Sequence, residues 1–202
     1  MRVKRCKICK KAIENPRPFQ KVCGYECSIE LIRQNHKKVW RKEKREKLPE
    51  LYPRRYKGLL QAEINRLAKK IDEKLGYNTC IDCGKPFGNQ IDASHYANIG
   101  SHSSIRFNLH NIHSSKSDCN QYRGGNKEGY TEGISKRYDS IYLEQIKSLD
   151  FKYGHIKLTS KDISEKLKLV RKLNRDFGTF KIGNGIEARD MFNKIIGIYK
   201  ED

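Results

Sequence analysis

Residues 80–126 read CIDCGKPFGNQIDASHYANIGSHSSIRFNLHNIHSSKSDCNQYRGGN, and this stretch concentrates the side chains that bind metals or move protons. It contains four of the six histidines, His95, His102, His110 and His113, together with three of the seven cysteines. A hydrophobic core requires no such cluster. Imidazole and thiol groups at this density are typical of zinc sites and of acid–base catalysis. The stretch therefore predicts a structural metal site, a catalytic site, or both.

The cysteines of this stretch predict a zinc site with an incomplete second cysteine pair. Cys80 and Cys83 form a CxxC knuckle, which normally requires a second pair later in the chain. Cys119 follows, but Lys116 occupies the position where a second CxxC would place its first thiol. We expect zinc bound by three cysteines and one histidine, with His113 as the first candidate for the fourth ligand and His110 as the second. A metal-free knuckle is the alternative.

The residues between the cysteines predict a strand, a second strand and a helix. IDASHY, residues 91–96, alternates like a short strand, and IRFNL, residues 105–109, is the second strand candidate. Ser114, Ser115 and Ser117 can start a helix that carries Cys119 and Asn120. Such a ββα unit would bring His95 close to Asn120.

Composition favours small modules and a polyanionic partner. The chain has 202 residues, of which 36% are hydrophobic and 33% charged, which is thin for one large core. The formal net charge of +19 predicts binding to nucleic acid through phosphate contacts. The charged N-terminus is not expected to be a signal peptide, and no apolar run is long enough to predict a membrane span. We therefore expect a cytoplasmic protein whose paired cysteines bind metal instead of forming disulfides.

Residues 1–32 predict a zinc finger. Two short cysteine pairs, separated by a loop with Pro16 and Pro18, supply four thiolates for a tetrahedral Zn²⁺ site. The predicted ligands are Cys6, Cys9, Cys23 and Cys27. The metal would close a module that is too small to fold alone.

Residues 33–57 predict a basic helix followed by a linker. The helix has a narrow apolar stripe, and Trp40 lies among its many basic residues, so we expect it to follow a phosphate backbone. A solvated helix with Glu–Lys pairs is the alternative. Pro49 and Pro53 are expected to end the helix and to begin a linker, YPRRYK. The predicted DNA contacts in this region are Lys37, Lys38, Arg41, Lys42, Arg45, Arg54 and Arg55.

The remaining segments predict helices, so the expected fold class is α+β. Apolar residues recur at helical spacing over 58–75, 134–149 and 188–199, and also in SEKLKLVRKLNRDF, residues 164–177, a helix that Thr159 or Ser160 can cap. The first of these helices is expected to pack on the module over 58–130. The helical region over 131–202 either supports the fold or forms a dimer interface.

The module resembles the HNH, or ββα-metal, nucleases. In that family the first strand carries a histidine that acts as general base, a middle asparagine orients it, and the helix carries a residue that binds the catalytic metal. The matching positions are His95, Asn111 with Asn108 as a rival, and Asn120. The family also places CxxC pairs around the motif, and Lys116 departs from that pattern.

The wider chain resembles the NinG/Rap recombination proteins of bacteriophages. The resemblance rests on the four-cysteine finger, the basic helix, and the segments CxxCG, DASHY, RFN, NIH and CNQYRGGN. It implies a structure-specific endonuclease that cuts branched DNA, including Holliday junctions and D-loops, in phage recombination, where other recombination proteins can be partners. Paired nicking of a junction requires two active sites, so we expect a homodimer.

The catalytic roles that this resemblance implies can be assigned to residues of this chain. A neutral His95 takes the proton of the attacking water. Mg²⁺ or Mn²⁺ prefers oxygen ligands, which Asp92 and Asn120 offer, although Ser94 stands where the family usually has an acidic ligand. Arg106 and Arg123 are expected to contact phosphates.

Two other functions remain open from the sequence. The finger, the basic helix and the incomplete second knuckle also suit a non-catalytic zinc-finger protein that binds nucleic acid. A sequence-specific HNH homing or restriction nuclease would share the chemistry but differ in substrate.

Overall fold

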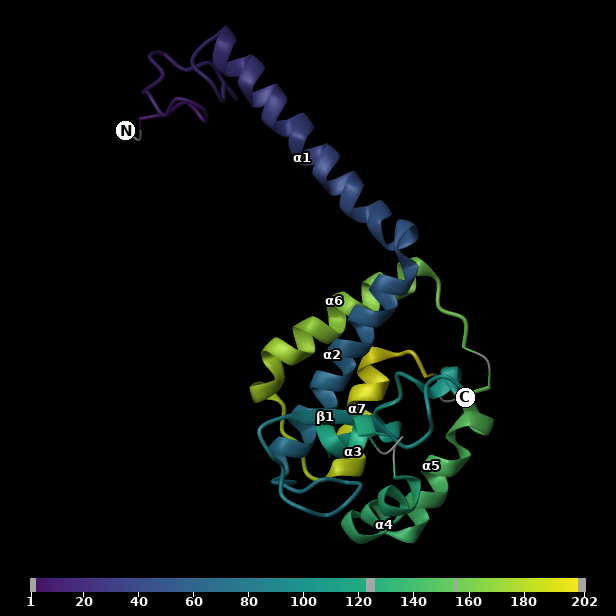
Figure 1. The fold of residues 1–202 in the computed structure, drawn as a ribbon. Helices are drawn as coiled ribbons and strands as arrows, with labels where there is room; N and C mark the ends of the chain where they lie inside the picture. Colours follow the sequence, from purple (N-terminus) through teal and green to yellow (C-terminus); the bar gives the residue numbers. More distant parts are fainter. Residues whose placement is uncertain (1–2, 123–125, 155, 200–202) are drawn as a thin grey trace. The chain divides into compact units, whose positions relative to one another are not determined.

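The chain divides into two compact units, Met1–Leu51 and Tyr52–Asp202. The computed structural model describes residues 3–122, 126–154 and 156–199 (Figure 1). Each unit is considered by itself.

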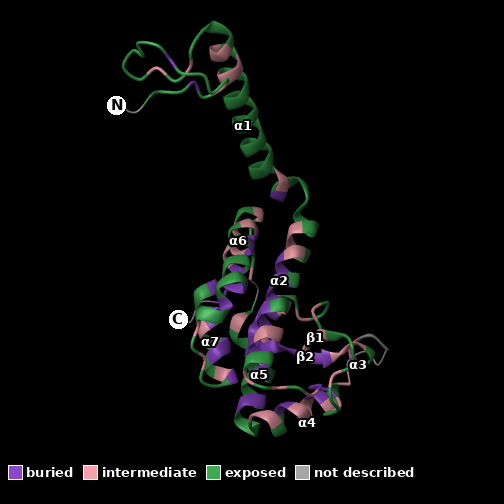
Figure 2. Ribbon diagram, turned by 90° about the vertical axis from the view of Figure 1, so that its left-hand side faces the viewer, coloured by how far each residue is buried: buried purple, intermediate pink, exposed green. Residues whose placement is uncertain are grey.

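Unit 1 is a small cysteine knuckle followed by one long helix. A bridge between Arg5 and Ala12 closes the knuckle, and α1, Tyr25–Leu51, extends over 27 residues. Most of this unit is exposed (Figure 2). Among its described residues, only Cys6, Ile13 and Pro49 are buried, so the unit has almost no apolar core.

The expected boundaries in this part of the chain are wrong. The boundary at 32/33 lies inside α1, and the linker expected over 52–57 is helical from Pro53 onward. Helix α1 continues through Pro49, and α2, Pro53–Lys74, begins at the second proline. Proline is favourable in the first turn of a helix because its missing N–H would have no partner there.

Helix α2 is the central element of unit 2, as the periodicity over 58–75 predicted. Leu60, Ile64, Leu67 and Ile71 are fully buried along one face. Helix α6, Ser160–Asp176, lies along α2 (Figures 1 and 2), and α7, Gly185–Ile196, contributes to the same core. The C-terminal helices therefore complete the core of unit 2 and do not form a separate region.

The small sheet has the predicted order but a different second strand. β1, Ile91–His95, pairs in antiparallel fashion with β2, Ile112–Lys116, and α3, Ser117–Tyr122, follows. The expected strand over 105–109 is replaced by two 3-10 turns, η1 Ser103–Ile105 and η2 Leu109–Asn111. Asn108 causes the second turn, because its side chain accepts the backbone N–H of His110.

The helix expected over 134–149 is two helices. α4, Lys127–Arg137, ends before Asp139, whose side chain caps α5, Ser140–Tyr153, by accepting the N–H of Tyr142 at 2.6 Å. The expected boundary at 130/131 thus lies inside α4. The capping box of α6 at Thr159 agrees with the sequence, and a short turn, η3 Phe177–Thr179, follows that helix.

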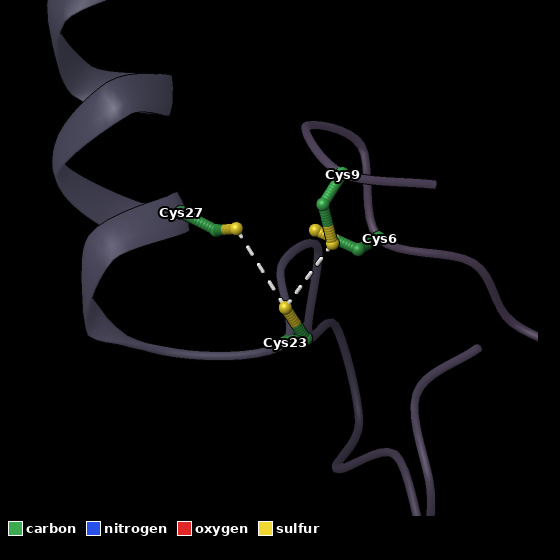
Figure 3. Close-up of side chains that lie close together, drawn as sticks. All are labelled: Cys6, Cys9, Cys23 and Cys27. Atoms are coloured by element: carbon green, nitrogen blue, oxygen red, sulfur yellow. Dashed lines mark hydrogen bonds between the residues drawn. The ribbon is translucent and has the colours of Figure 1, made fainter. Parts of the chain in front are cut away.

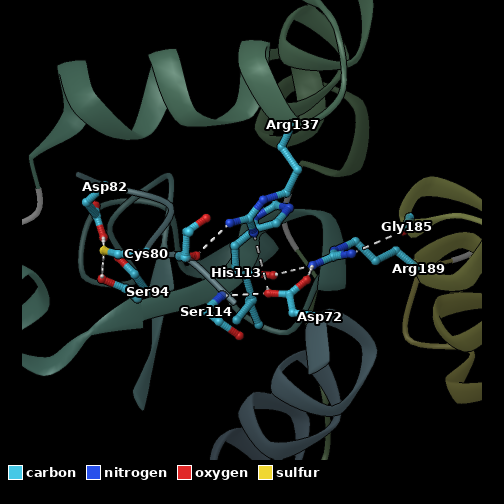
Figure 4. A network of polar contacts seen from close by, with 12 residues as sticks. Asp72, Cys80, Asp82, Ser94, His113, Ser114, Arg137, Gly185 and Arg189 are labelled. Carbon is cyan, nitrogen blue, oxygen red and sulfur yellow. Dashed lines mark hydrogen bonds and ion pairs between the residues drawn. The ribbon is translucent and has the colours of Figure 1, made fainter. Parts of the chain in front are cut away.

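A buried ion pair connects three parts of unit 2. Arg189 of α7 is fully buried and donates from Nη2 to Asp72 Oδ1 of α2 at 2.6 Å (Figure 4). The guanidinium also donates to the carbonyls of Leu109 and Gly185, each at 3.1 Å. The other oxygen of Asp72 accepts the N–H of Ser114 in β2 at 2.7 Å. This network fixes the sheet against α2 and α7.

Candidate active site and metal centres

The first candidate metal centre brings together the four thiols of the N-terminal knuckle (Figure 3). Their sulfur atoms all lie within 4.8 Å of one another. The Sγ atoms of Cys9 and Cys23 are 3.5 Å apart, and those of Cys23 and Cys27 are 3.6 Å apart. A tetrahedral zinc ion with Zn–S bonds of about 2.3 Å requires sulfur atoms about 3.8 Å apart. The thiols, including Cys6, therefore fit a zinc ion.

Backbone hydrogen bonds favour the thiolate form of one ligand in this knuckle, Cys6, whereas hydrogen bonds with neighbouring thiols raise the pKa values of Cys23 and Cys27. Burial raises the pKa of Cys6, but backbone N–H groups of Cys9, Ile8 and Cys23 donate to its sulfur. Their net effect lowers the pKa of Cys6 to about 6, so the thiolate predominates at neutral pH.

The same turn recurs at the second cysteine pair. Cys6 donates its N–H to the carbonyl of Lys11 at 2.9 Å, and Cys80 donates to the carbonyl of Lys85 at 2.8 Å. The residue before each acceptor has a positive φ, 64° in the first turn and 67° at Gly84 in the second. Glycine adopts this conformation without strain. Both CxxC pairs are therefore built as knuckles.

The second candidate centre holds three thiols, Cys80, Cys83 and Cys119, within 4.8 Å of one another. The sulfur atoms of Cys83 and Cys119 are 3.5 Å apart, and the backbone N–H of Lys116 donates to Cys80 Sγ at 3.2 Å. These three thiols could hold a zinc ion, with the fourth position still to be supplied.

The expectation that a histidine supplies the fourth ligand is wrong. His113 is fully buried outside the cluster, and its Nδ1 lies 3.0 Å from the Tyr130 hydroxyl. The His113 ring instead packs edge-on against the rings of Tyr130 and Tyr138. His110 is also engaged elsewhere, with Tyr142 at 2.8 Å and Asp190 at 2.9 Å.

Replacing Lys116 by cysteine is expected to complete the second cluster. Structural zinc binding contributes about 10–16 kcal/mol over four ligands, so one added thiolate should tighten zinc binding on the order of 100-fold. Competition with a fluorescent chelator measures the change. Lys136→Cys, an exposed position on α4, is the matched control and should leave zinc affinity unchanged. Equal affinities in the two variants would contradict the assignment of Lys116 to the open position.

A polar cavity of about 550 Å³ lies beside the sheet and contains both catalytic candidates, His95 and Asn120. It is bounded by α2, by β1 and the loop after it, by α3 and by α4. The remaining lining residues are Gln61, Asn65, Ala93, Ser94, Tyr96, Ala97, Asn98, Ile99, His102, Lys127 and Tyr130. The predicted proximity of the strand histidine and the helix asparagine is thus present.

His95 is held by one ring nitrogen. Its Nε2 lies 3.3 Å from the carbonyl oxygen of Arg106 and 3.2 Å from Nε2 of Gln61. Burial lowers the pKa of His95 to about 4, the Arg106 charge adds to this effect, and the hydrogen bond to the Arg106 carbonyl opposes it. His95 is therefore neutral at physiological pH, which is the form a general base requires.

Asn111 clamps the loop that follows His95. It is fully buried, its Oδ1 accepts the N–H of Ala97 at 2.8 Å, and its Nδ2 donates to the carbonyl of Ala97 at 3.1 Å. The rival, Asn108, instead bonds His110 N–H and Asn193, each at 3.0 Å. Of the two candidates, Asn111 is therefore the one whose side chain contacts the loop after His95.

Asp92 reaches the cavity through Asn120. The amide Nδ2 of Asn120 lies 3.3 Å from Asp92 Oδ2, but Asp92 is not among the described residues that line the cavity. Strand alternation places the side chains of Asp92 and His95 on opposite faces of β1. A carboxylate beside an amide nevertheless offers the hard oxygen donors that fit Mg²⁺ or Mn²⁺.

The predicted DNA-contacting residues fall into three groups. Those on α1, Lys37, Lys38, Arg41, Lys42 and Arg45, are exposed, as are Arg54 and Arg55 in the first turn of α2. Arg106 is half-buried and donates to Gln61 Oε1 at 3.1 Å. Arg123 lies outside the described residues.

Among the cavity residues that sequence reasoning missed are Gln61 and Lys127. Gln61 links His95 to Arg106 from the buried face of α2, and nothing in the helical pattern distinguishes it. Lys127 places its ammonium 5.6 Å from the ring centre of Tyr96 and supplies a cation to the cavity.

Together, two cysteine knuckles that could hold zinc and a polar cavity between a helix and a small sheet define a cysteine-knuckle protein with a histidine-containing site. The model of the bacteriophage lambda NinG protein family matches residues 1–177. The chain belongs to this bacteriophage family, whose members are associated with phage recombination. No curated protein and no solved structure matched. Among the described residues, no helix is long and apolar enough to cross a membrane.

Proposed function

We propose that this protein is a metal-dependent endonuclease of the HNH type that cuts branched DNA in phage recombination. The observation that carries the proposal is the single cavity shared by His95 and Asn120. An imidazole that is neutral at physiological pH can take a proton from the attacking water, and the amide oxygen of Asn120 can bind the divalent cation that stabilises the developing charge.

His95 acts as the general base. The proposed role uses the tautomer in which Nε2 carries the proton and donates to the Arg106 carbonyl, while the Gln61 amide lies beside the same nitrogen. Nδ1 then has a free lone pair and takes the proton of the water that attacks the phosphorus. Asn111 positions this imidazole by clamping the backbone at Ala97.

Asp92 and Asn120 would hold a divalent cation, Mg²⁺ or Mn²⁺, which supplies charge stabilisation for the phosphate and the leaving oxygen. Lys127 adds a positive charge on the cavity wall. Zinc ions at the two cysteine clusters have a structural role, since neither cluster includes a cavity residue.

The proposed substrate is DNA, because the chain has a high positive charge and its basic side chains on α1 are exposed. The chain carries a net charge of +19, and the basic side chains of α1 are exposed along an almost bare helix. We propose branched DNA, including Holliday junctions and D-loops, as the substrate because the chain resembles the recombination endonucleases of the NinG/Rap family. A homodimer would supply the two active sites that paired nicking requires.

Cleavage of defined DNA substrates tests this function. The purified protein is expected to nick a labelled four-way junction with Mg²⁺ or Mn²⁺, to cut linear duplex of the same sequence far more slowly, and to lose activity in EDTA. Preference for one linear sequence over all junctions would indicate a homing or restriction nuclease instead.

A non-catalytic DNA-binding protein is the second candidate function. The specific observation in its favour is that Ser94 replaces an acidic ligand and Asp92 does not line the cavity. Binding of the junction without cleavage, across Mg²⁺, Mn²⁺, Co²⁺ and Zn²⁺, would establish this function and contradict the first.

A further inference from the structure

A second imidazole lines the cavity of His95. His102 lies in the loop after β1, and its Nδ1 is 2.7 Å from Oδ2 of Asp150 on α5. The Ser104 hydroxyl donates to the other oxygen of the same carboxylate. Two residues of one loop therefore hold Asp150 at both oxygens.

This arrangement differs from an ordinary surface ion pair. The side chain of His102 is 42% exposed, so a ligand in the cavity can reach it. A carboxylate that accepts from Nδ1–H determines which ring nitrogen carries that proton and fixes the orientation of the ring. Nε2 is then the nitrogen that remains for chemistry in the cavity.

The backbone around His102 is also fixed. Its N–H donates to the carbonyl of Asn98 at 2.8 Å, and the preceding segment is held by the clamp of Asn111 on Ala97. Asn111 thus positions the loop that begins after His95 and carries His102. His95 is the neutral base, and His102 is oriented by an acid on a different helix.

We propose that His102 is a second catalytic residue, the general acid that protonates the leaving 3′-oxygen, with Asp150 and Ser104 as its positioning residues. This inference rests on the proposed nuclease function. The acting form of His102 is the imidazolium, whose Nδ1–H donates to Asp150.

The step balances with that assignment. Water forms the new P–O bond and gives one proton to His95. The bond from phosphorus to the 3′-oxygen breaks, and its electron pair goes to that oxygen. The Nε2–H of His102 supplies the proton that the oxygen needs, and His102 is left neutral. The proton on His95 and the neutral His102 return to their starting states by exchange with solvent.

The test compares two junctions that differ in one atom. One has an ordinary 3′-oxygen at the cleaved bond, and the other has a bridging 3′-sulfur, which leaves without protonation. His102→Ala is expected to lower the single-turnover rate about 10²- to 10⁴-fold on the oxygen junction but less than about tenfold on the sulfur junction. His95→Ala is expected to lower both rates, because both junctions need an activated water.

Asp150→Asn provides a second variant that keeps the shape of the side chain. Like His102→Ala, it should lower the rate more on the oxygen junction than on the sulfur junction, but the difference should be smaller. Glu144→Gln, on the exposed face of the same helix, is the matched control and should cut both junctions at the wild-type rate. Near-ultraviolet circular dichroism of each variant checks that unit 2 is folded.

The possible outcomes distinguish failure of the general-acid role from failure of the proposed nuclease function. Suppose that wild type cuts and that His102→Ala lowers the single-turnover rate equally on the oxygen and sulfur junctions. His102 then only binds the DNA or supports the structure of the site, and the general-acid role is overturned. Wild-type rates in His102→Ala overturn it as well. If wild type cuts no junction with any divalent cation, the nuclease function and this inference both fall.

Discussion

Removal of zinc is expected to unfold the N-terminal knuckle, residues 3–24, and to leave unit 2 folded. In the described part of unit 1, burial is confined to Cys6, Ile13 and Pro49, so apolar burial cannot offset the conformational entropy of ordering the knuckle. Zinc binding to a four-thiolate site contributes about 10–16 kcal/mol, which is enough to do so. The knuckle should therefore fold when zinc binds and unfold when zinc is removed.

Limited trypsin digestion with and without a strong chelator measures this effect, because the knuckle contains many lysine and arginine residues. Cleavage between residues 4 and 21 should become rapid only when zinc is removed. Cys9→Ser should digest rapidly even with zinc present. Cys83→Ser is the matched control from the other cluster, and it should leave the knuckle protected. Protection of residues 4–21 in the chelator would contradict a folding role for the metal.

Replacement of Arg189 by methionine is expected to lower the free energy of unfolding of unit 2 by about 3–5 kcal/mol. The substitution leaves the carboxylate of Asp72 buried without its closest cation and removes bonds to the Leu109 and Gly185 carbonyls. The midpoint of urea denaturation measures the loss. Near-ultraviolet circular dichroism is the suitable signal, since Tyr130 and Tyr142 are buried in unit 2.

Arg171→Met is the matched control for this prediction. Arg171 pairs with Glu63 at 3.4 Å, but its side chain is 44% exposed, so its loss should cost less than about 1 kcal/mol. A double variant, Asp72→Leu with Arg189→Met, should be less destabilised than the sum of the single variants, because no unpaired charge remains at that contact. Equal midpoints for Arg189→Met and wild type would contradict the structural role of the pair.

Local patterns were sufficient for the parts of the fold with short-range causes. The spacing of Leu60, Ile64, Leu67 and Ile71 predicts the buried face of α2, and the CxxC spacing predicts both knuckles. The strand containing His95 was also predicted. In each case the residues that decide the local structure are close together in the sequence.

The errors arose where a side chain overrides a pattern or where partners lie far apart. Ile105, Phe107 and Leu109 alternate like a strand and are all buried, but Asn108 turns the chain, and β2 begins later. The position of β2 sets the direction of each side chain in it, so misplacing this strand hid the fact that His113 faces the core.

The long-range partners of the site had no local signal. Gln61 reaches His95 across 34 positions, and Asp150 reaches His102 across 48. Either contact depends on how α2, α5 and the loop after β1 pack together. The residue types that carry the chemistry could thus be read from residues 80–126, whereas the residues that orient them could not.

The central claim is that His95 acts as the base that activates water in the shared cavity. Single-turnover cleavage of a four-way junction by wild type and His95→Ala, at saturating Mg²⁺ or Mn²⁺, tests this claim most directly. Loss of general-base catalysis should lower the rate about 10²- to 10⁴-fold while junction affinity stays unchanged. A His95→Ala protein that binds the junction and cuts it at the wild-type rate would contradict the claim.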